Sequence, residues 1–318
     1  LNLLDGVTAL ATSVNGLSDA LIETNSIYIG NDPSSTTDDA QHNVAIGINA
    51  LDAVTTGDEN VAIGYDALTS NTTGEDNTAS GYQSMKSNTT GSYNTAYGNR
   101  SFYSNTEGNF NTAYGRQSLY SNTTGLFNTA SGYQSLYSNT EGHSNTAYGY
   151  QSLRYNTTGV YNTAFGFLSL YSNTTGVGNT ASGYSSLRYN TEGASNTTSG
   201  HYSLFRNTTG SKNTASGTSS LRNNTTGTNN TALGYESGDV ITTGTNNVML
   251  GYQTDPSAAD ATNQIVIGKG ATGHGDNIAV IGNGSNTAIH PHDNNEVDLG
   301  SSSYKFKNLH LAGSALVG

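Results

Sequence analysis

The sequence predicts an all-β fold, a repetitive parallel β-solenoid built from 17-residue rungs along most of the 318-residue chain. Three observations predict it: a glycine that returns every 17 residues, an alternating strand pattern around an alanine two residues before it, and an Asn-Thr-Thr-Gly or Asn-Thr-Glu-Gly turn in most periods. A short fixed period is the mark of a stacked array. The spacing holds to Gly268 and drops to 14 residues before Gly282; the glycines are Gly30, Gly47, Gly64, Gly81, Gly98, Gly115, Gly132, Gly149, Gly166, Gly183, Gly200, Gly217, Gly234, Gly251, Gly268 and Gly282.

Each rung is numbered here from its asparagine, so that Asn128 is position one. Position three is alanine in nearly every rung, and from Leu51 to Leu221 position nine is leucine, methionine or phenylalanine. Because side chains alternate along a strand, positions two and four share one face and position three takes the other. The predicted structural core of the repeat is represented by Ala113, Gly115, Leu119, Ala130, Gly132 and Leu136.

A second strand is expected at positions six to ten. The following Asn-to-Gly turn, such as residues 122–125, then returns the chain to the next rung, because Asn and Gly favour left-handed and side-chain-bonded turns. The prediction is two short strands and two turns in each rung.

Composition narrows the classes of function. Only 11% of residues are charged, and the chain has 21 tyrosines, three prolines and no cysteine, which favours an ordered repeat over a disordered polar chain. The net charge of −12 argues against a nucleic-acid partner. No stretch reaches the roughly 18 apolar residues of a membrane helix, so we expect no membrane insertion.

The rungs are poor in core-forming residues, which indicates self-association. One buried leucine contributes about 1.5 to 3 kcal/mol, whereas fixing each backbone residue costs about 1 to 2 kcal/mol. Other copies of the same chain are the expected source of further burial. They could cover the face of positions two and four or the face of position three, and the sequence leaves both open.

Two rungs resemble a known family. "NVAIGINAL" at 43–51 and "NVAIGYDAL" at 60–68 are similar to the head repeats of trimeric autotransporter adhesins. The later "NTAxGYxSLxxNTTG" copies resemble the longer-looped rungs of phage tail-fibre and virion fibre proteins. The resemblance implies a left-handed β-roll over residues 25–285 and a homotrimer.

Sequence stretches near both ends of the chain favour a phage fibre over an autotransporter adhesin. "LNLLDGVTA" at 1–9 is similar to a phrase in phage tail fibres, and residues 286–318 contain a stretch that resembles the collar before a tail-fibre chaperone domain. Residues 1–24 are predicted to form a short helical coiled-coil neck, with a solitary amphipathic helix or loop as the alternative. The expected neck positions are Leu3, Leu10 and Leu17 at d, with Val7, Val14 and Leu21 at a.

No enzyme, cofactor or metal site is predicted. Glu107, Glu141 and Glu192 recur at one turn position but in non-adjacent rungs, so they form no converging acid pair. His290 and His292 are spaced to share one strand face and could ligate a metal on a trimer axis, but a proline turn explains them as well.

The aromatic columns are the candidate receptor-facing residues. Position ten supplies Tyr103, Tyr120, Tyr137 and Tyr171. Tyrosine suits glycan or protein recognition, and the alternative is a stacking ladder that only stabilises the roll.

The predicted function is therefore a structural fibre of a phage virion, a tail or head fibre that is extracellular, homotrimeric and attaches to a host glycan or protein. Its N-terminus is expected to contact other virion proteins. The alternative is a trimeric autotransporter-type adhesin on a bacterial cell surface. An ice-binding face along the threonines of position two is less favoured, because position four is Ser, Tyr or Phe in the middle rungs.

Overall fold

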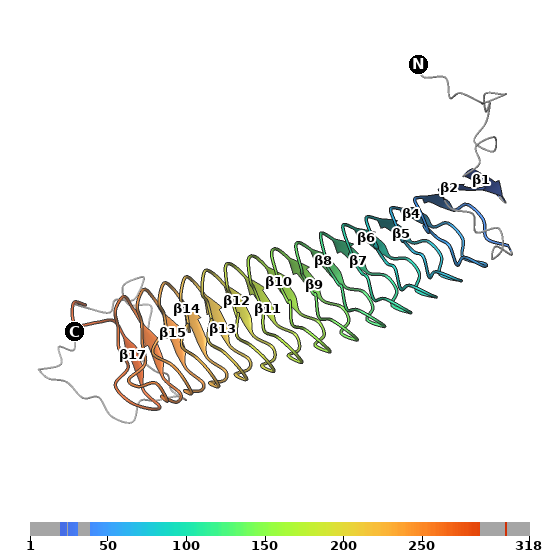
Figure 1. Cartoon of the computed structure of the whole chain (residues 1–318). Coiled ribbons are helices and arrows are strands. Elements are labelled where there is room, and N and C mark those ends of the chain that lie inside the picture. The colour runs from blue at the N-terminus through green and yellow to red at the C-terminus, as the bar shows by residue number, and fades with distance from the viewer. Residues whose placement is uncertain (1–19, 24, 31–38, 287–302, 304–318) are drawn as a thin grey trace, which may run out of the picture. The chain divides into compact units, whose positions relative to one another are not determined.

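Successive 17-residue turns of backbone stack on one another along a single axis (Figure 1). The structure is a computed structural model that describes residues 20–23, 25–30, 39–286 and 303. The chain divides into two units, residues 1–283 and 284–318. The first unit contains the solenoid; of the second, the structure describes 284–286 and 303.

Each rung contributes one short strand to a single parallel sheet. Strand β2 (Ser26–Ile29) pairs in parallel with β3, and every later strand pairs in parallel with the next. The register is residue for residue, as where Ala130 faces Ala147. The strands are β3 (Val44–Ile46), β4 (Val61–Ile63), β5 (Thr78–Ser80), β6 (Thr95–Tyr97), β7 (Thr112–Tyr114), β8 (Thr129–Ser131), β9 (Thr146–Tyr148), β10 (Thr163–Phe165), β11 (Thr180–Ser182), β12 (Thr197–Ser199), β13 (Thr214–Ser216), β14 (Thr231–Leu233), β15 (Val248–Leu250), β16 (Ile265–Ile267) and β17 (Ala279–Ile281).

The predicted all-β parallel solenoid with 17-residue rungs is thus confirmed, including the shortened last period between Ile265 and Ala279. The left-handed sense of winding and the trimer stay predictions. Of the predicted helical neck at 1–24, the structure describes Ala20–Glu23, which form strand β1, antiparallel to β2; the rest lies outside the described residues. The predicted collar lies outside them too, apart from 286 and 303.

The second strand predicted at positions six to ten is wrong. In the rung that starts at Asn111, this segment is a run of turns, and Gln117 and Leu119 have φ values of 57° and 49°. The Ser118 amide donates to the Gly115 carbonyl three residues earlier, as in a turn. Left-handed backbone costs a non-glycine residue about 1 to 2 kcal/mol, and here it turns the leucine side chain into the interior.

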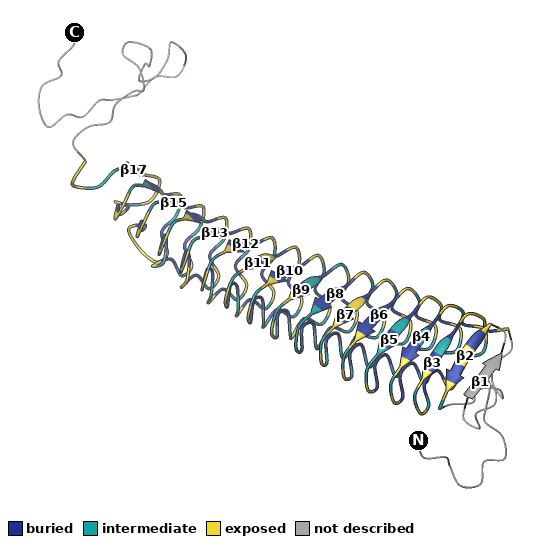
Figure 2. Cartoon of the chain, turned by 90° about the horizontal axis from the view of Figure 1, so that it is seen from above, coloured by how far each residue is buried: buried dark blue, intermediate teal, exposed yellow. Residues whose placement is uncertain are grey.

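The interior is a narrow column in which the same rung positions are buried in rung after rung (Figure 2). Ala113, Ala130, Leu119 and Leu136 are completely buried. They share the interior with polar side chains: in the rung that starts at Asn111, positions one, eight and twelve are also buried. In the middle rungs these positions hold Asn, Ser and Asn, so the core is as much amide and hydroxyl as hydrocarbon.

Buried asparagines of successive rungs hydrogen-bond to one another, since a buried polar group needs a partner. At position one, the Asn145 backbone amide and Nδ2 donate to the Asn128 Oδ1 at 3.1 and 3.2 Å, and Asn145 Nδ2 also donates to the Gly159 carbonyl at 2.8 Å. A second column at position twelve repeats this logic between Asn122 and Asn139. The backbone outside the strands also bonds at this spacing, as from the Leu136 amide to the Ser152 carbonyl.

Glycine at position five is required by close approach. Gly132 has φ of 137°, and a Cβ there would lie 2.4 Å from the Gly149 carbonyl oxygen. Gly115 has φ of 119° and meets Gly132 in the same way at 2.8 Å. The repeated glycines therefore line up along the axis, where only a residue without a side chain lets successive rungs approach.

Candidate functional site

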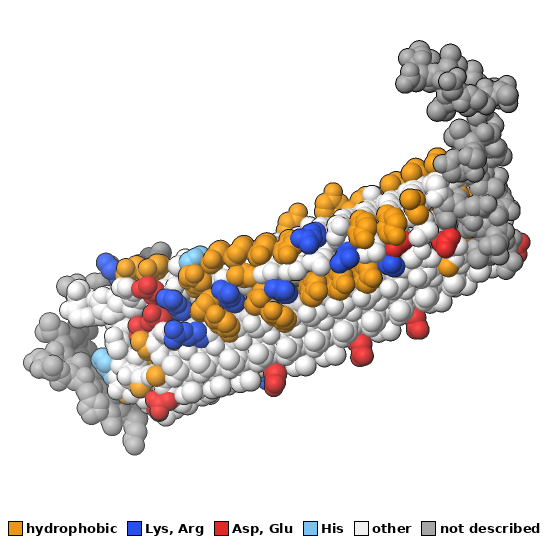
Figure 3. Space-filling view, viewed as in Figure 1, with side chains coloured by type: hydrophobic (Ala, Val, Ile, Leu, Met, Phe, Trp, Pro, Cys, Tyr) orange, Lys and Arg blue, Asp and Glu red, His pale blue; other side chains and the backbone are white. Residues whose placement is uncertain are grey.

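The turn segment at positions six to eleven builds one outer face of the solenoid. Because the left-handed residues at positions seven and nine direct position nine inward, positions six and ten are left on the outside. Figure 3 shows apolar side chains, tyrosines among them, in rows along this side of the solenoid, with cationic side chains among them.

Three of the four candidate receptor-facing tyrosines form a continuous stack. The rings of Tyr103 and Tyr120 lie 5.1 Å apart with 8° between their planes, and those of Tyr120 and Tyr137 lie 5.0 Å apart at 5°. Each of these tyrosines directly follows the buried position-nine residue of its rung, as Tyr137 follows Leu136. Burial, followed by the neighbouring tyrosines, raises the pKa of the central Tyr120 hydroxyl.

The fourth tyrosine is separated from that stack. Arg154 occupies position ten between Tyr137 and Tyr171, and its Nη1 donates to the Tyr171 hydroxyl at 3.3 Å. Tyr171 instead meets Tyr155 edge-on, with ring centroids 5.0 Å apart and planes at 85°. The structure therefore brings Tyr103, Tyr120 and Tyr137 together and places Tyr171 in a different, arginine-containing setting.

Aromatic side chains also stack in rows at other rung positions. At position six, Tyr150 and Phe167 stack at 5.0 Å, and Phe167 and Tyr184 at 5.1 Å. A row at position seventeen, which the sequence analysis did not single out, stacks Phe110 on Phe127 at 5.1 Å. Stacked identical positions follow directly from the in-register rungs, so a stacking ladder exists whatever the face binds.

Arginines insert between the rings in a repeated arrangement that sequence reasoning missed. The Arg154 guanidinium lies 5.6 Å from the Tyr137 ring and 5.1 Å from the Tyr155 ring. Two rungs later the Arg188 guanidinium lies 5.6 Å from Tyr171 and 5.4 Å from Tyr189. The signal was in the chain as the twice-repeated phrase Leu-Arg-Tyr-Asn at 153–156 and 187–190.

Charges are segregated between faces in the middle rungs. Between residues 77 and 229 the chain has eight lysines and arginines but only three acids, although its total charge is −12. The three acids, Glu107, Glu141 and Glu192, lie at exposed turns of position fourteen. Seven of the cations lie at positions six, seven, ten or eleven: Lys86, Arg100, Arg116, Arg154, Arg188, Arg206 and Arg222. The middle of an acidic protein thus carries a cationic and aromatic face.

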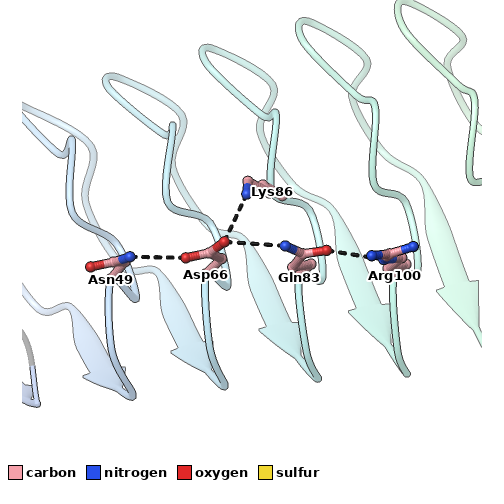
Figure 4. A network of polar contacts seen from close by, with 5 residues as sticks. All are labelled: Asn49, Asp66, Gln83, Lys86 and Arg100. Carbon is pink, nitrogen blue, oxygen red and sulfur yellow. Dashed lines mark hydrogen bonds and ion pairs between the residues drawn. The ribbon is translucent and has the colours of Figure 1, made fainter.

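A row of hydrogen-bonded polar side chains runs along position seven near the N-terminal end of this face (Figure 4). Asp66 accepts hydrogen bonds from Asn49 at 3.0 Å and from Gln83 at 3.2 Å, and pairs with Lys86 at 2.7 Å. Gln83 in turn accepts from the Arg100 Nε at 3.0 Å. Burial opposes ionisation of Asp66, but the hydrogen bonds from Lys86 and the two amides outweigh it, so the pKa of Asp66 lies below its ordinary value.

Acids gather at one place near the C-terminal end of the solenoid. Burial, reinforced by the charge of Asp239, raises the pKa of Asp255 to about 6. Its Oδ1 has no hydrogen-bond partner among the described residues, and burial followed by the charge of Glu236 also raises the pKa of Asp239.

The described residues contain no group of three or more His, Asp or Glu side chains that could hold a metal ion. His290 and His292 lie outside the described residues. Among the described segments, no helix is long and apolar enough to cross a membrane.

Comparison with protein families and with curated protein sequences finds no match for this chain.

Proposed function

We propose that this chain is the repetitive, rigid part of a homotrimeric phage fibre that carries host-attachment surfaces away from the virion. The observation that supports it most is the in-register stack of strands from β2 to β17, in which each strand pairs in parallel with the next and 17-residue rungs recur as far as β16. Such an array is suited to serve as a spacer, because its length grows by about 4.8 Å with each added rung.

The outward sheet face is the proposed contact between copies. Position three is buried from β2 to β16, as at Ala113, so of the two strand faces the one with positions two and four is left for a partner. From β2 to β17 that face carries no charged residue. It exposes large apolar side chains, with 41% of Ile46 and 60% of Tyr114 accessible.

The occupant proposed for this face is another copy of the chain. A second solenoid with the same rung spacing can match the face rung by rung along its whole length, which a partner of different period cannot. Exposed apolar surface of this extent is uncommon on a soluble monomer. Three copies around one axis would cover the face on each of them.

Size-exclusion chromatography with light scattering tests the assembly. A trimer is expected for the unaltered chain. Tyr114→Lys combined with Tyr148→Lys should shift it toward monomer, because three like charges would meet at each level. Thr124→Lys combined with Thr158→Lys, at exposed turns of position fourteen in the same two rungs, is the matched control and should leave the trimer intact. A cooperatively folding monomer at micromolar concentration, or a trimer indifferent to the two lysines, contradicts the proposal.

Immunogold labelling with antibodies to the chain tests the location. Label on fibres of purified phage particles supports the virion assignment. Label on bacterial cells that carry no phage would instead support the surface-adhesin alternative.

A further inference from the structure

We infer that the row formed by Arg154, Tyr171, Arg188, Phe205 and Arg222, called here the arginine row, binds a linear acidic polysaccharide. This deepens the proposed attachment function, on which it rests, by naming the chemical class of the receptor. The row runs along position ten over five successive rungs, with arginine and aromatic residues alternating.

The guanidinium groups of Arg154 and Arg188 are held in place without an anionic partner, whereas that of Arg222 lies near enough to Asp239 for its charge to lower the pKa of that carboxyl. Among the described residues, none of the three arginines has a carboxylate within ion-pair distance, whereas Lys86 pairs with Asp66. The Nε atoms of Arg154 and Arg188 are buried and make no hydrogen bond. The donors that remain for a ligand are therefore the Nη groups, of which Arg154 Nη1 already donates to the Tyr171 hydroxyl. Guanidinium N–H groups match carboxylate and sulfate oxygens.

The rings fix where those donors point. Arg154 and Arg188 each lie between two tyrosines at nearly the same distances, and Arg222 lies 5.4 Å from the Tyr202 ring. Cation–π contacts stabilise these positions without neutralising the charge. Pre-ordered side chains lose less entropy when a ligand binds, which favours recognition at this place over the long flexible lysines elsewhere.

The spacing indicates a repeating ligand. Arg154, Arg188 and Arg222 are each 34 residues apart, or two rungs, which is about 10 Å at about 4.8 Å per strand. An extended disaccharide unit is of comparable length, so a glycan with one acidic group per disaccharide presents its charges at the same interval. Tyr171, in the rung between two of the cations, and Tyr155 and Tyr189, each next to an arginine in the chain, add hydroxyls that can bond to sugar hydroxyls.

The aromatic stacking argues against single-stranded nucleic acid as the occupant. Nucleic-acid platforms need free ring faces on which bases stack. In this protein the Tyr120 ring is covered on both faces by Tyr103 and Tyr137, and Arg154 lies over Tyr137. The net charge of −12 also opposes a polymer that carries a phosphate at every nucleotide.

The test measures binding of the full chain to immobilised hyaluronate, which carries one carboxylate per disaccharide, with neutral dextran and oligo(dT) as comparison probes. Binding to hyaluronate is expected at about 50 mM NaCl and should weaken strongly at about 500 mM. Arg154→Gln combined with Arg188→Gln should weaken it at least about tenfold. Lys212→Gln combined with Lys269→Gln removes the same charge from exposed residues outside the row and should change it by less than about threefold.

Each other outcome overturns the inference. If the chain does not bind hyaluronate at low salt, acidic polysaccharide is the wrong ligand class. If both double variants lose the same affinity, net charge explains the binding and the arginine row does not. If oligo(dT) binds more tightly than hyaluronate, the ligand is a nucleic acid. Circular dichroism and light scattering on the same samples show whether each variant still folds and assembles. A trimer that fails to bind contradicts only this inference, whereas a monomer that binds contradicts only the proposed assembly.

Discussion

The Nδ2 of Asn139 donates to the Oδ1 of Asn122 at 2.7 Å, one rung away and inside the solenoid. The same contact links Asn105 to Asn88 at 2.6 Å, and it runs through position twelve as far as Asn224. The column ends there because Ile241 occupies the next place, and the Asn224 Oδ1 is left without a partner. This column of asparagines therefore helps to fix the register between rungs, and that register in turn stacks the side chains on the outside.

Asn122→Ala is expected to destabilise the chain by about 2 to 4 kcal/mol, since it removes three buried hydrogen bonds, those that the Asn122 amide makes to Asn105, Gly125 and Asn139. Denaturant unfolding followed by circular dichroism measures the change. Thr124→Ala, at the exposed turn two residues later, is the control and should change the free energy of unfolding by less than about 0.5 kcal/mol. Equal effects of the two substitutions would show that the ladder is not a main source of stability.

Leu136→Asp should unfold the repeat around its rung, at a cost of at least about 4 kcal/mol, because it buries an unpaired charge in the column. Tyr137→Ala, the next residue, removes one stacked ring on the outside and should cost about 1 kcal/mol. Thermal unfolding compares the two. If they prove equally damaging, the inner and outer faces have been assigned wrongly.

Gly132→Ala should be strongly destabilising, because the new Cβ would lie 2.4 Å from the Gly149 carbonyl oxygen and the rungs cannot separate without breaking their ladder. Gly270→Ala is the comparison: it also has positive φ, but no atom lies within 4 Å of its Cβ position. Only the backbone cost of about 1 kcal/mol is expected there. Similar melting temperatures for the two variants would contradict the close-approach argument.

Asp255→Asn should stabilise the chain at pH 7. The pKa of Asp255 is raised to about 6 from 3.8, so the folded state binds the proton more tightly than the unfolded state. Ionised Asp255 therefore destabilises the fold, and stability at this group falls as pH rises from about 4 to about 6. With allowance for solvent screening, the gain at pH 7 is about 1 kcal/mol or less.

Melting temperatures of the Asp255→Asn and unaltered chains at pH 7 and pH 4 measure this effect. The difference should vanish at pH 4, where Asp255 is protonated in the folded state. Asp260→Asn, at an exposed carboxylate, is the control and should make little difference at either pH. A gain that persists at pH 4 would assign the effect to packing rather than to charge.

The sequence by itself determined the solenoid and its period. Gly132 and Gly149 stand 17 residues apart because rungs meet backbone to backbone there, and the alternation around Ala130 follows from the single buried position of each strand. Such features depend on residues close together in the sequence, and the same residue pattern occurs in many rungs, so a single sequence is enough to detect them. Tyrosine recurs at position ten in successive rungs, so the sequence also predicted a tyrosine stack.

Only the tertiary structure decided where the remaining side chains lie. Leu119 looked like a strand residue, but the rung closes only if it takes a left-handed turn that directs it inward. Asn122 was predicted only as a turn residue, but stacking encloses it, and its partner is then the Asn139 amide rather than water. The setting of Arg154 depends likewise on the Tyr137 ring of the preceding rung and the Tyr171 hydroxyl of the next. These contacts join residues about one turn of the solenoid apart, and the physical reason they escape sequence reasoning is that the path of the backbone between them, not the residue types, sets which side chains meet.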